Sequence, residues 1–283
     1  MAFECFILDF DGTFTDVEQE AGPFLEAYRE DLAATFGSEL AEAWREAEAT
    51  IDAAPEEHGW EHRGAIVAPA TSDPYVRATV TANALLDEHG LLPDPEERSR
   101  VLSGMYKRNY GKSRAVFRPE AKHVIETLID TGKPTYVVSN SDTTAVRQKI
   151  ARLDPRGRES LTVLGDARKY VIAEPEPTDE TFDALPEKAW VDDLERPIYV
   201  RRGHYYEVLR EIWRDTGTRP EQTFLAGDIY ELDLAMPARL GVRVHLLARA
   251  STPQYEKHVV ENEHAGSVSE HLHAILTALG LEG

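Results

Sequence analysis

With 283 residues, the chain is longer than the roughly 100 to 200 typical of one domain, so two domains or one domain with a large insertion are expected. The composition is that of an ordinary globular protein. The sequence shows no pattern of a secretory signal and no apolar run near the roughly 20 residues of a membrane span, so we expect a cytoplasmic protein with no membrane partner. The net charge of −20 argues against a nucleic-acid partner, whose phosphates the chain would repel.

The first predicted element is a buried strand at residues 3–8, where an apolar run includes Cys5, expected to be a buried, reduced thiol. The sequence "DFDGT" follows directly and places two carboxylates, Asp9 and Asp11, two positions apart. In extended chain this spacing puts both on one face, and Gly12 lets the chain turn away after them. The pattern therefore indicates a site at the end of this strand.

The next hundred residues are mainly helical. Apolar residues recur with helical spacing from about Gly22 to Tyr110, which predicts a helical insertion. Residues 56–74 are rich in Gly, Pro and mixed polar residues and are predicted to form a loop. His58 and His62 in this loop lack the further ligand spacing of a metal site, although the loop could line a substrate entrance.

From Pro119 onward the pattern alternates between helices and strands. Strands are predicted at 134–141, 161–166, 198–202, 223–228 and 242–248. Such alternation is typical of an α/β fold, and we predict a Rossmann-like, doubly wound parallel sheet with both faces covered by helices. The acidic, Pro-rich stretch at 173–197 is predicted to be a surface excursion without an assigned role.

Polar residues gather where these predicted strands end, and ligands of parallel sheets bind at that edge. They include a carboxylate that could act as a nucleophile, a second one that could carry a proton, amide and hydroxyl donors for anionic oxygens, a cation, and further acids for Mg²⁺. The residues at these ends, in chain order, are Asp9, Asp11, Ser139, Asn140, Arg201, Arg202, Asp228 and Asp233.

These motifs resemble those of the haloacid dehalogenase superfamily of phosphotransferases. "DFDGT" matches its first motif, "VVSNS" its second and "GDIYELD" its fourth, in the family's order. The resemblance implies a catalytic core made of residues 1–16 and 117–283, and a helical cap of the family's C1 type at residues 17–116.

The resemblance also implies roles for individual residues. Asp9 would be the nucleophile that forms an aspartyl-phosphate, and Asp11 would protonate the leaving alcohol and then activate water. Mg²⁺ would be held by Asp9, the backbone carbonyl of Asp11 and Asp228, with Asp233 binding directly or through water. Independently, a phosphate dianion beside several carboxylates requires a hard, oxygen-bound cation such as Mg²⁺.

Two donors and a cation complete the predicted site. Ser139 and Asn140 would donate hydrogen bonds to phosphoryl oxygens. The family's third motif usually has a Lys at the start of the helix before the fourth motif, and this chain has "RRGHYY" there. We predict that Arg202 is this catalytic and substrate-binding cation, with Lys169 and Arg201 as alternatives, because Arg can clamp phosphate through two hydrogen bonds.

The function predicted from these residues is Mg²⁺-dependent hydrolysis of a small-molecule phosphate ester. A phosphomutase and a non-catalytic protein that binds a phosphorylated ligand or a partner remain as alternatives. Dehalogenation is disfavoured because relatives with that activity lack the second Asp, which is present here as Asp11. Glu231 competes with Asp233 as the last ligand of the metal ion. The sequence is compatible with both a monomer and a homodimer.

Overall fold

The computed structural model describes residues 3–264 and 266–281. The chain divides into two units, Met1–Asp16 with Phe117–Gly283, called the core unit below, and Val17–Val116, called the helical unit.

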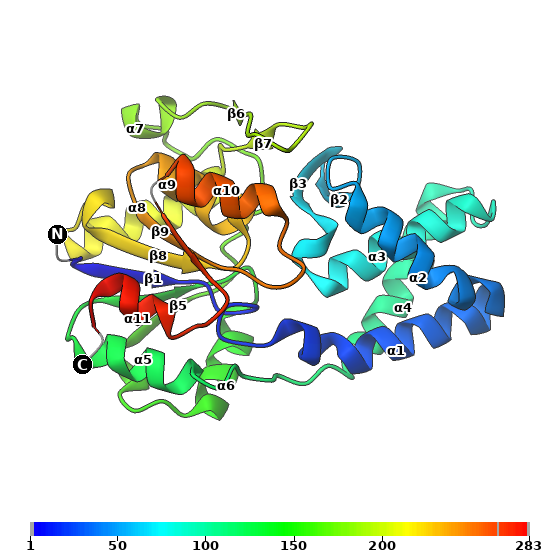
Figure 1. Cartoon of the computed structure of the whole chain (residues 1–283), viewed down its shortest axis with the longest axis horizontal. Helices are drawn as coiled ribbons and strands as arrows, with labels where there is room; N and C mark the ends of the chain where they lie inside the picture. The colour runs from blue at the N-terminus through cyan, green and yellow to red at the C-terminus, as the bar shows by residue number, and fades with distance from the viewer. Residues whose placement is uncertain (1–2, 265, 282–283) are drawn as a thin grey trace. The chain divides into compact units, whose positions relative to one another are not determined.

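The core unit is built on a six-stranded sheet in the order β10-β9-β8-β1-β4-β5 (Figure 1). Every pair of neighbouring strands in it is parallel. The predicted α/β fold with a doubly wound parallel sheet is therefore confirmed. The strands are β1 (Cys5–Leu8), β4 (Thr135–Val138), β5 (Leu161–Leu164), β8 (Thr223–Gly227), β9 (Arg243–Leu247) and β10 (Ser267–Ser269), the last of which the sequence pattern did not indicate.

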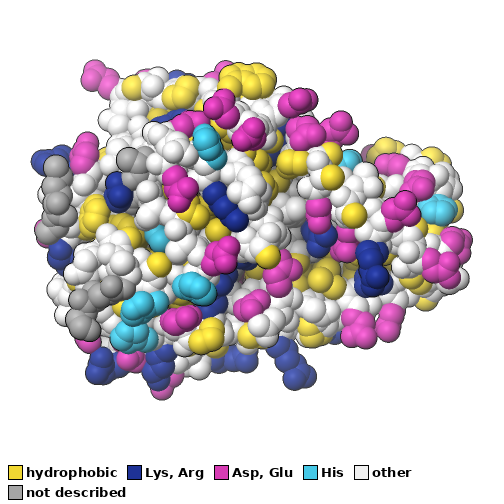
Figure 2. Space-filling view, in the orientation of Figure 1, with side chains coloured by type: hydrophobic (Ala, Val, Ile, Leu, Met, Phe, Trp, Pro, Cys, Tyr) yellow, Lys and Arg dark blue, Asp and Glu magenta, His cyan; other side chains and the backbone are white. Residues whose placement is uncertain are grey.

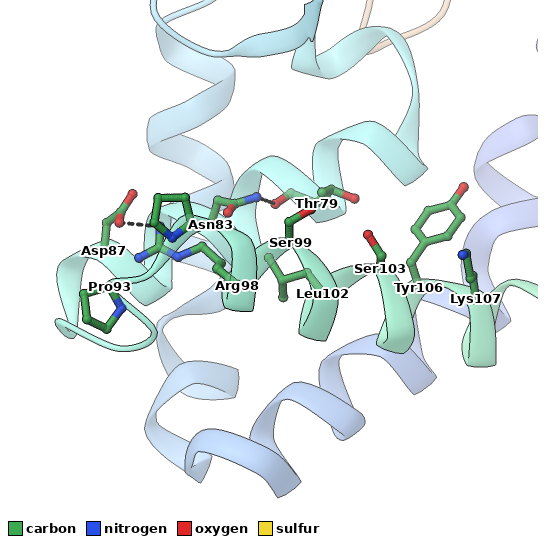
Figure 3. Close-up of a pocket in the computed structure, with 11 residues that line it drawn as sticks. Thr79, Asn83, Asp87, Pro93, Arg98, Ser99, Leu102, Ser103, Tyr106 and Lys107 are labelled. Carbon is green, nitrogen blue, oxygen red and sulfur yellow. Dashed lines mark hydrogen bonds and ion pairs between the residues drawn. The ribbon is translucent and has the colours of Figure 1, made fainter.

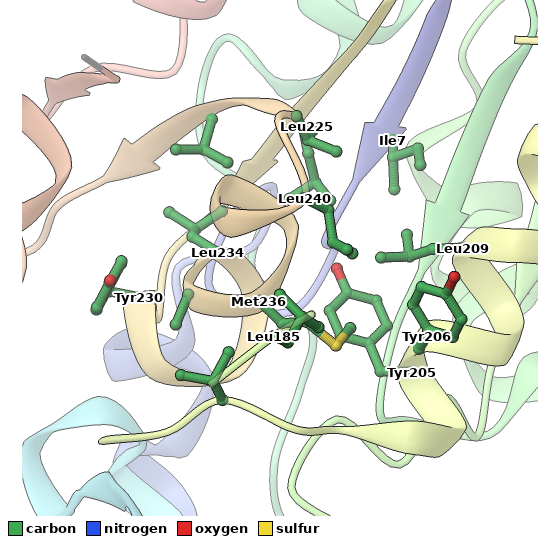
Figure 4. Close-up of a cluster of buried hydrophobic side chains, with 14 of the residues drawn as sticks. Ile7, Leu185, Tyr205, Tyr206, Leu209, Leu225, Tyr230, Leu234, Met236 and Leu240 are labelled. Atoms are coloured by element: carbon green, nitrogen blue, oxygen red, sulfur yellow. The ribbon is translucent and has the colours of Figure 1, made fainter. Parts of the chain in front are cut away.

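Each face of the sheet is buried under its own set of helices, because side chains alternate between the faces along each strand. Cys5 and Ile7 point into a cluster with residues of α8 (Gly203–Thr216), α9 (Ala235–Arg239) and α10 (Gln254–Asn262), part of which Figure 4 shows. Phe6 and Leu8 point into the opposite cluster, with α5 (Ala121–Asp130), α6 (Thr143–Leu153) and α11 (Ala274–Leu279). Figure 1 shows these two sets of helices on opposite sides of the strands.

The chain between β5 and α8 corrects one predicted element. Residues 198–202 were expected to form a strand of the main sheet, but only β7 (Ile198–Tyr199) forms, and it pairs antiparallel with β6 (Lys188–Ala189) in a separate two-stranded sheet. A short apolar run does not reveal its partner, and here α8 begins at Gly203, directly after the run. This segment also contains α7 (Glu180–Asp183), and Phe182 and Leu185 anchor it in the cluster beside α8.

The helical unit contains four helices that share one core of aliphatic and aromatic residues. The helices are α1 (Val17–Phe36), α2 (Ser38–Ala53), α3 (Pro74–Glu88) and α4 (Pro95–Tyr110). Asp73 and Asp94 cap α3 and α4, each followed by a proline that suits the first helical position. The stretch expected to be a loop instead forms a hairpin of β2 (Gly59–His62) and β3 (Ala65–Pro69). These strands have four and five residues and pair with each other, which is too short for an apolar periodicity to reveal them.

The surface reflects the acidic composition. On the face drawn in Figure 2, Asp and Glu side chains are spread over the molecule and interspersed with Lys and Arg. Within residues 3–264 and 266–281, no helix has the length and hydropathy needed to cross a membrane.

Candidate active site

Three buried aspartates converge at the carboxyl edge of the sheet. Asp9 directly follows β1 and Asp228 directly follows β8, and these strands are neighbours in which Leu8 pairs with Ala226. Asp233 comes from the turn of π-helix Tyr230–Leu234, which folds back over the end of β8. One oxygen of each carboxylate lies within 4.8 Å of the other two. The predicted positions Asp9, Asp228 and Asp233 are thus brought together, and the cluster could hold a metal ion.

Two glycines allow this close approach. Gly12 has φ +87°, and a Cβ there would lie 2.2 Å from Oδ2 of Asp228. A Cβ on Gly227 would lie 2.6 Å from Cβ of Asp233. Because distances this short are excluded for real side chains, the turn after β1 and the end of β8 both require glycine. Thr13 in the same turn donates a hydrogen bond to Asp9 (3.2 Å), a contact the sequence reasoning missed.

Burial and mutual repulsion perturb these carboxylates. Burial raises the pKa of Asp9 well above its ordinary value; Lys169 opposes this shift, and Asp233 and Asp228 add to it. Burial also raises the pKa of Asp228 to about 7, although Arg249 lowers it, with Nη2 of Arg249 3.0 Å from Oδ2 of Asp228. Carboxylates that resist ionisation in this way gain from a bound cation, which favours their charged forms.

The cation at the centre of this cluster is Lys169, which corrects the prediction of Arg202. Nζ of Lys169 lies 2.8 Å from Oδ1 of Asp9 and 2.7 Å from Oδ1 of Asp233, and its side chain is only 1% exposed. Burial lowers the pKa of Lys169, but Asp233 and Asp9 outweigh burial and raise it above the ordinary value. Lys169 is therefore charged, and it joins the first and fourth motifs.

Arg202 serves a different part of the core unit. Its guanidinium donates to the carbonyl oxygen of Tyr170 (3.0 Å), and the charged groups that influence its pKa are Glu231 and Arg196. Burial lowers this pKa to about 10. Arg201, the other alternative, donates to the carbonyl oxygens of Leu185 and Asp183. The cation beside Asp9 therefore comes from the irregular segment after β5, which contains Lys169, and not from the start of α8, where the family's motif would place it.

A second group of contacts surrounds Asp11. Oδ2 of Asp11 accepts hydrogen bonds from Oγ of Ser141 (2.7 Å) and Oγ of Ser139 (3.3 Å), and Oδ1 accepts one from Nζ of Lys149 (2.6 Å). Ser139 and Ser141 follow β4, the neighbour of β1 on the side opposite β8. The structure thus brings predicted Ser139 to Asp11. Sequence reasoning missed Ser141 and Lys149, although Ser141 lies within the motif itself.

Asn140 and Glu231 have structural contacts. Oδ1 of Asn140 accepts a hydrogen bond from the backbone N–H of Lys169 (2.7 Å) and so fixes the loop that carries this cation. Glu231 is bound by two hydrogen bonds from Arg196, at 2.6 and 2.9 Å, and accepts a third from the hydroxyl of Tyr255. Of the two acids that competed for the last metal position, Asp233 faces the cluster.

A separate cavity of about 700 Å³ lies within the helical unit, between α3 and α4 (Figure 3). Some of its polar groups already interact with each other, because Arg98 pairs with Asp87 and Nδ2 of Asn83 donates to the carbonyl oxygen of Thr79. None of the clustered aspartates of the core unit lines it, so it contributes no group to the candidate active site.

The fold and site define an α/β protein with a carboxylate cluster, bridged by a lysine, at the carboxyl edge of its sheet. A family model of haloacid dehalogenase-like hydrolases matches residues 3–241, so the chain belongs to this family, as the motifs indicated. No curated protein sequence matches the chain.

Solved structures of low sequence identity share the fold. One is the HAD hydrolase YfnB from Bacillus subtilis bound to magnesium, with 14% identity and a TM-score of 0.53 over 99% of this chain and 100% of that one. Another is a predicted phosphoglycolate phosphatase from Haemophilus somnus 129PT, with 14% identity and a TM-score of 0.53 over 97% of each chain.

Proposed function

We propose that the protein is a Mg²⁺-dependent phosphomonoester hydrolase that acts on a small phosphorylated metabolite through an aspartyl-phosphate at Asp9. The observation that carries this proposal is the joint position of Lys169 between Asp9 and Asp233, with Asp228 beside them. This arrangement provides a nucleophile, a fixed cation for an anionic substrate and a set of oxygen ligands within one buried cluster.

The residues present fit a divalent cation with oxygen ligands. Asp9, Asp228 and Asp233 would hold it, and the family resemblance adds the backbone carbonyl of Asp11. Burial opposes ionisation of Asp9 and Asp228, so a cation there would favour their charged forms. When bound, Mg²⁺ would neutralise charge on the phosphoryl oxygens.

The residues of the chain would divide the reaction between them. An oxygen of Asp9 attacks phosphorus, the bond from phosphorus to the leaving alcohol oxygen breaks, and Asp11 gives that oxygen a proton. Water then attacks phosphorus, Asp11 accepts its proton, and inorganic phosphate leaves Asp9 free again. Lys169 is placed to balance the charge of Asp9 and of the phosphoryl group during both steps.

Asp11 favours phosphate chemistry over dehalogenation within this family. A halide leaves without a proton, whereas an alcohol oxygen benefits from a general acid. Asp11 lies two residues after Asp9 and accepts hydrogen bonds from Ser139 and Ser141, which follow the neighbouring strand β4. A phosphomutase would use the same two aspartates, and only the fate of the phosphoryl group separates it from a hydrolase.

The test is release of inorganic phosphate from a panel of sugar phosphates, nucleotides, phosphorylated short acids and 4-nitrophenyl phosphate. Wild type and Asp9→Asn are compared with Mg²⁺ and with EDTA, and Lys122→Met, an exposed substitution on α5, is the control. We expect turnover that requires both Mg²⁺ and Asp9. Turnover unchanged in Asp9→Asn would refute the mechanism, and transfer to a second hydroxyl without phosphate release would establish the mutase.

A further inference from the structure

Asp11 is held on both carboxylate oxygens, and the shortest of its hydrogen bonds comes from a residue that no motif contains. Lys149 lies on α6, and its Nζ is 2.6 Å from Oδ1 of Asp11. Ser141 holds the other oxygen at 2.7 Å. The side chains of Lys149 and Asp11 are 20% and 24% exposed, so water only partly screens this ion pair.

The position of Lys149 is set by the packing of α6. Val146 and Ile150, one turn before and one residue after it along the chain, are buried in the cluster under the sheet and fix the rotation of the helix. Asp142 caps the helix by accepting hydrogen bonds from the backbone N–H groups of Thr144 and Ala145. Lys149 therefore projects toward Asp11 from a rigid element.

We propose that Lys149 is a positioning residue for Asp11: together with Ser141 it fixes the direction of the carboxyl group that transfers a proton to the leaving oxygen. The inference rests on the proposed function of Asp11. A carboxyl group turns easily about its last side-chain bond, and proton transfer requires a heavy-atom separation of roughly 2.6 to 3.2 Å. Contacts at both oxygens restrict that rotation. Lys169 has a different task, because it contacts Asp9 and not Asp11.

This role predicts a dependence on the leaving group. 4-Nitrophenolate is a weak base and leaves without a proton, whereas phenolate is a stronger base and gains from a general acid. Both esters have similar size, so binding differences between them are small. The ratio kcat/KM reports the steps up to departure of the alcohol. It therefore measures the role of Asp11 as a proton donor separately from its later role as the acceptor of a proton from water.

The experiment measures kcat/KM of Mg²⁺-loaded enzyme for phenyl phosphate and 4-nitrophenyl phosphate. For Lys149→Met we expect a loss about tenfold larger with phenyl phosphate than with 4-nitrophenyl phosphate, a modest part of the roughly 10²- to 10⁴-fold that general acid catalysis supplies. Ser141→Ala should show the same pattern more weakly. Lys149→Arg, which keeps a cation, should recover part of the loss.

Arg147→Met is the matched control, because Arg147 is exposed on the same helix, two residues before Lys149. It should leave both values unchanged. Equal losses for the two esters in Lys149→Met, or no loss, would overturn the positioning role while the hydrolase itself stands. A wild-type enzyme that cleaves neither of these esters nor any member of the substrate panel would overturn the proposed function, and the role of Lys149 with it.

Discussion

The buried pair of Arg196 and Glu231 allows a quantitative test of how the segment before α8 supports the fourth motif. We consider Arg196→Met, which removes both hydrogen bonds from Arg196 to Glu231. The Glu231 side chain is 0% exposed and would keep the hydrogen bond from the hydroxyl of Tyr255. Two hydrogen bonds to a charged group contribute about 1.5 to 3 kcal/mol each. Loss of one partner of a buried pair typically costs about 3 to 5 kcal/mol, so we expect unfolding to become easier by a similar amount.

The assay is urea unfolding at neutral pH for wild type, Arg196→Met, Glu231→Leu and the double variant. Removing both charges leaves the neutral hydroxyl of Tyr255 without this acceptor, which costs less than an unpaired buried charge, so the double variant should be more stable than Arg196→Met. A loss below about 1 kcal/mol in Arg196→Met would show that water or another group replaces the arginine. A double variant no more stable than that single variant would refute the reasoning that unpaired charge causes the loss.

Three further predictions follow from buried groups of the core unit. Burial lowers the pKa of His245 to about 4, from about 6.5 in the unfolded chain, so the free energy of unfolding should fall by about 3 kcal/mol as the pH falls from 6.5 to 4. In urea unfolding, His245→Gln should lose less stability over this pH range than wild type, and an equal pH dependence of the two would contradict the prediction. Burial raises the pKa of Cys5 to about 12, so a thiol reagent should label it slowly in the native protein and rapidly in urea; rapid native labelling would show that the strand opens. Mg²⁺ should raise the Tm of wild type and not that of Asp228→Asn, and an equal rise in both would place the ion elsewhere.

Local sequence patterns predicted five of the six strands of the main sheet and most of the candidate site. A short apolar run followed by polar residues predicts a buried strand and a site at its end, and parallel strands must present these ends at one edge. For this reason Asp9, Asp228 and Ser139 could be placed from the sequence, and Gly12 could be recognised as a turn. The helical spacing between the first and second motifs predicted the helices of the inserted segment in the same way.

The tertiary structure decided which charged side chains meet these aspartates. Lys169 reaches Asp9 from an irregular loop, and Lys149 reaches Asp11 from the second turn of a helix, 138 positions along the chain. Arg202 stood in the expected place along the sequence and contacts the carbonyl of Tyr170 instead. The physical reason is that apolar periodicity reports which face of an element is buried, whereas the partner of a long, flexible charged side chain depends on how distant segments pack.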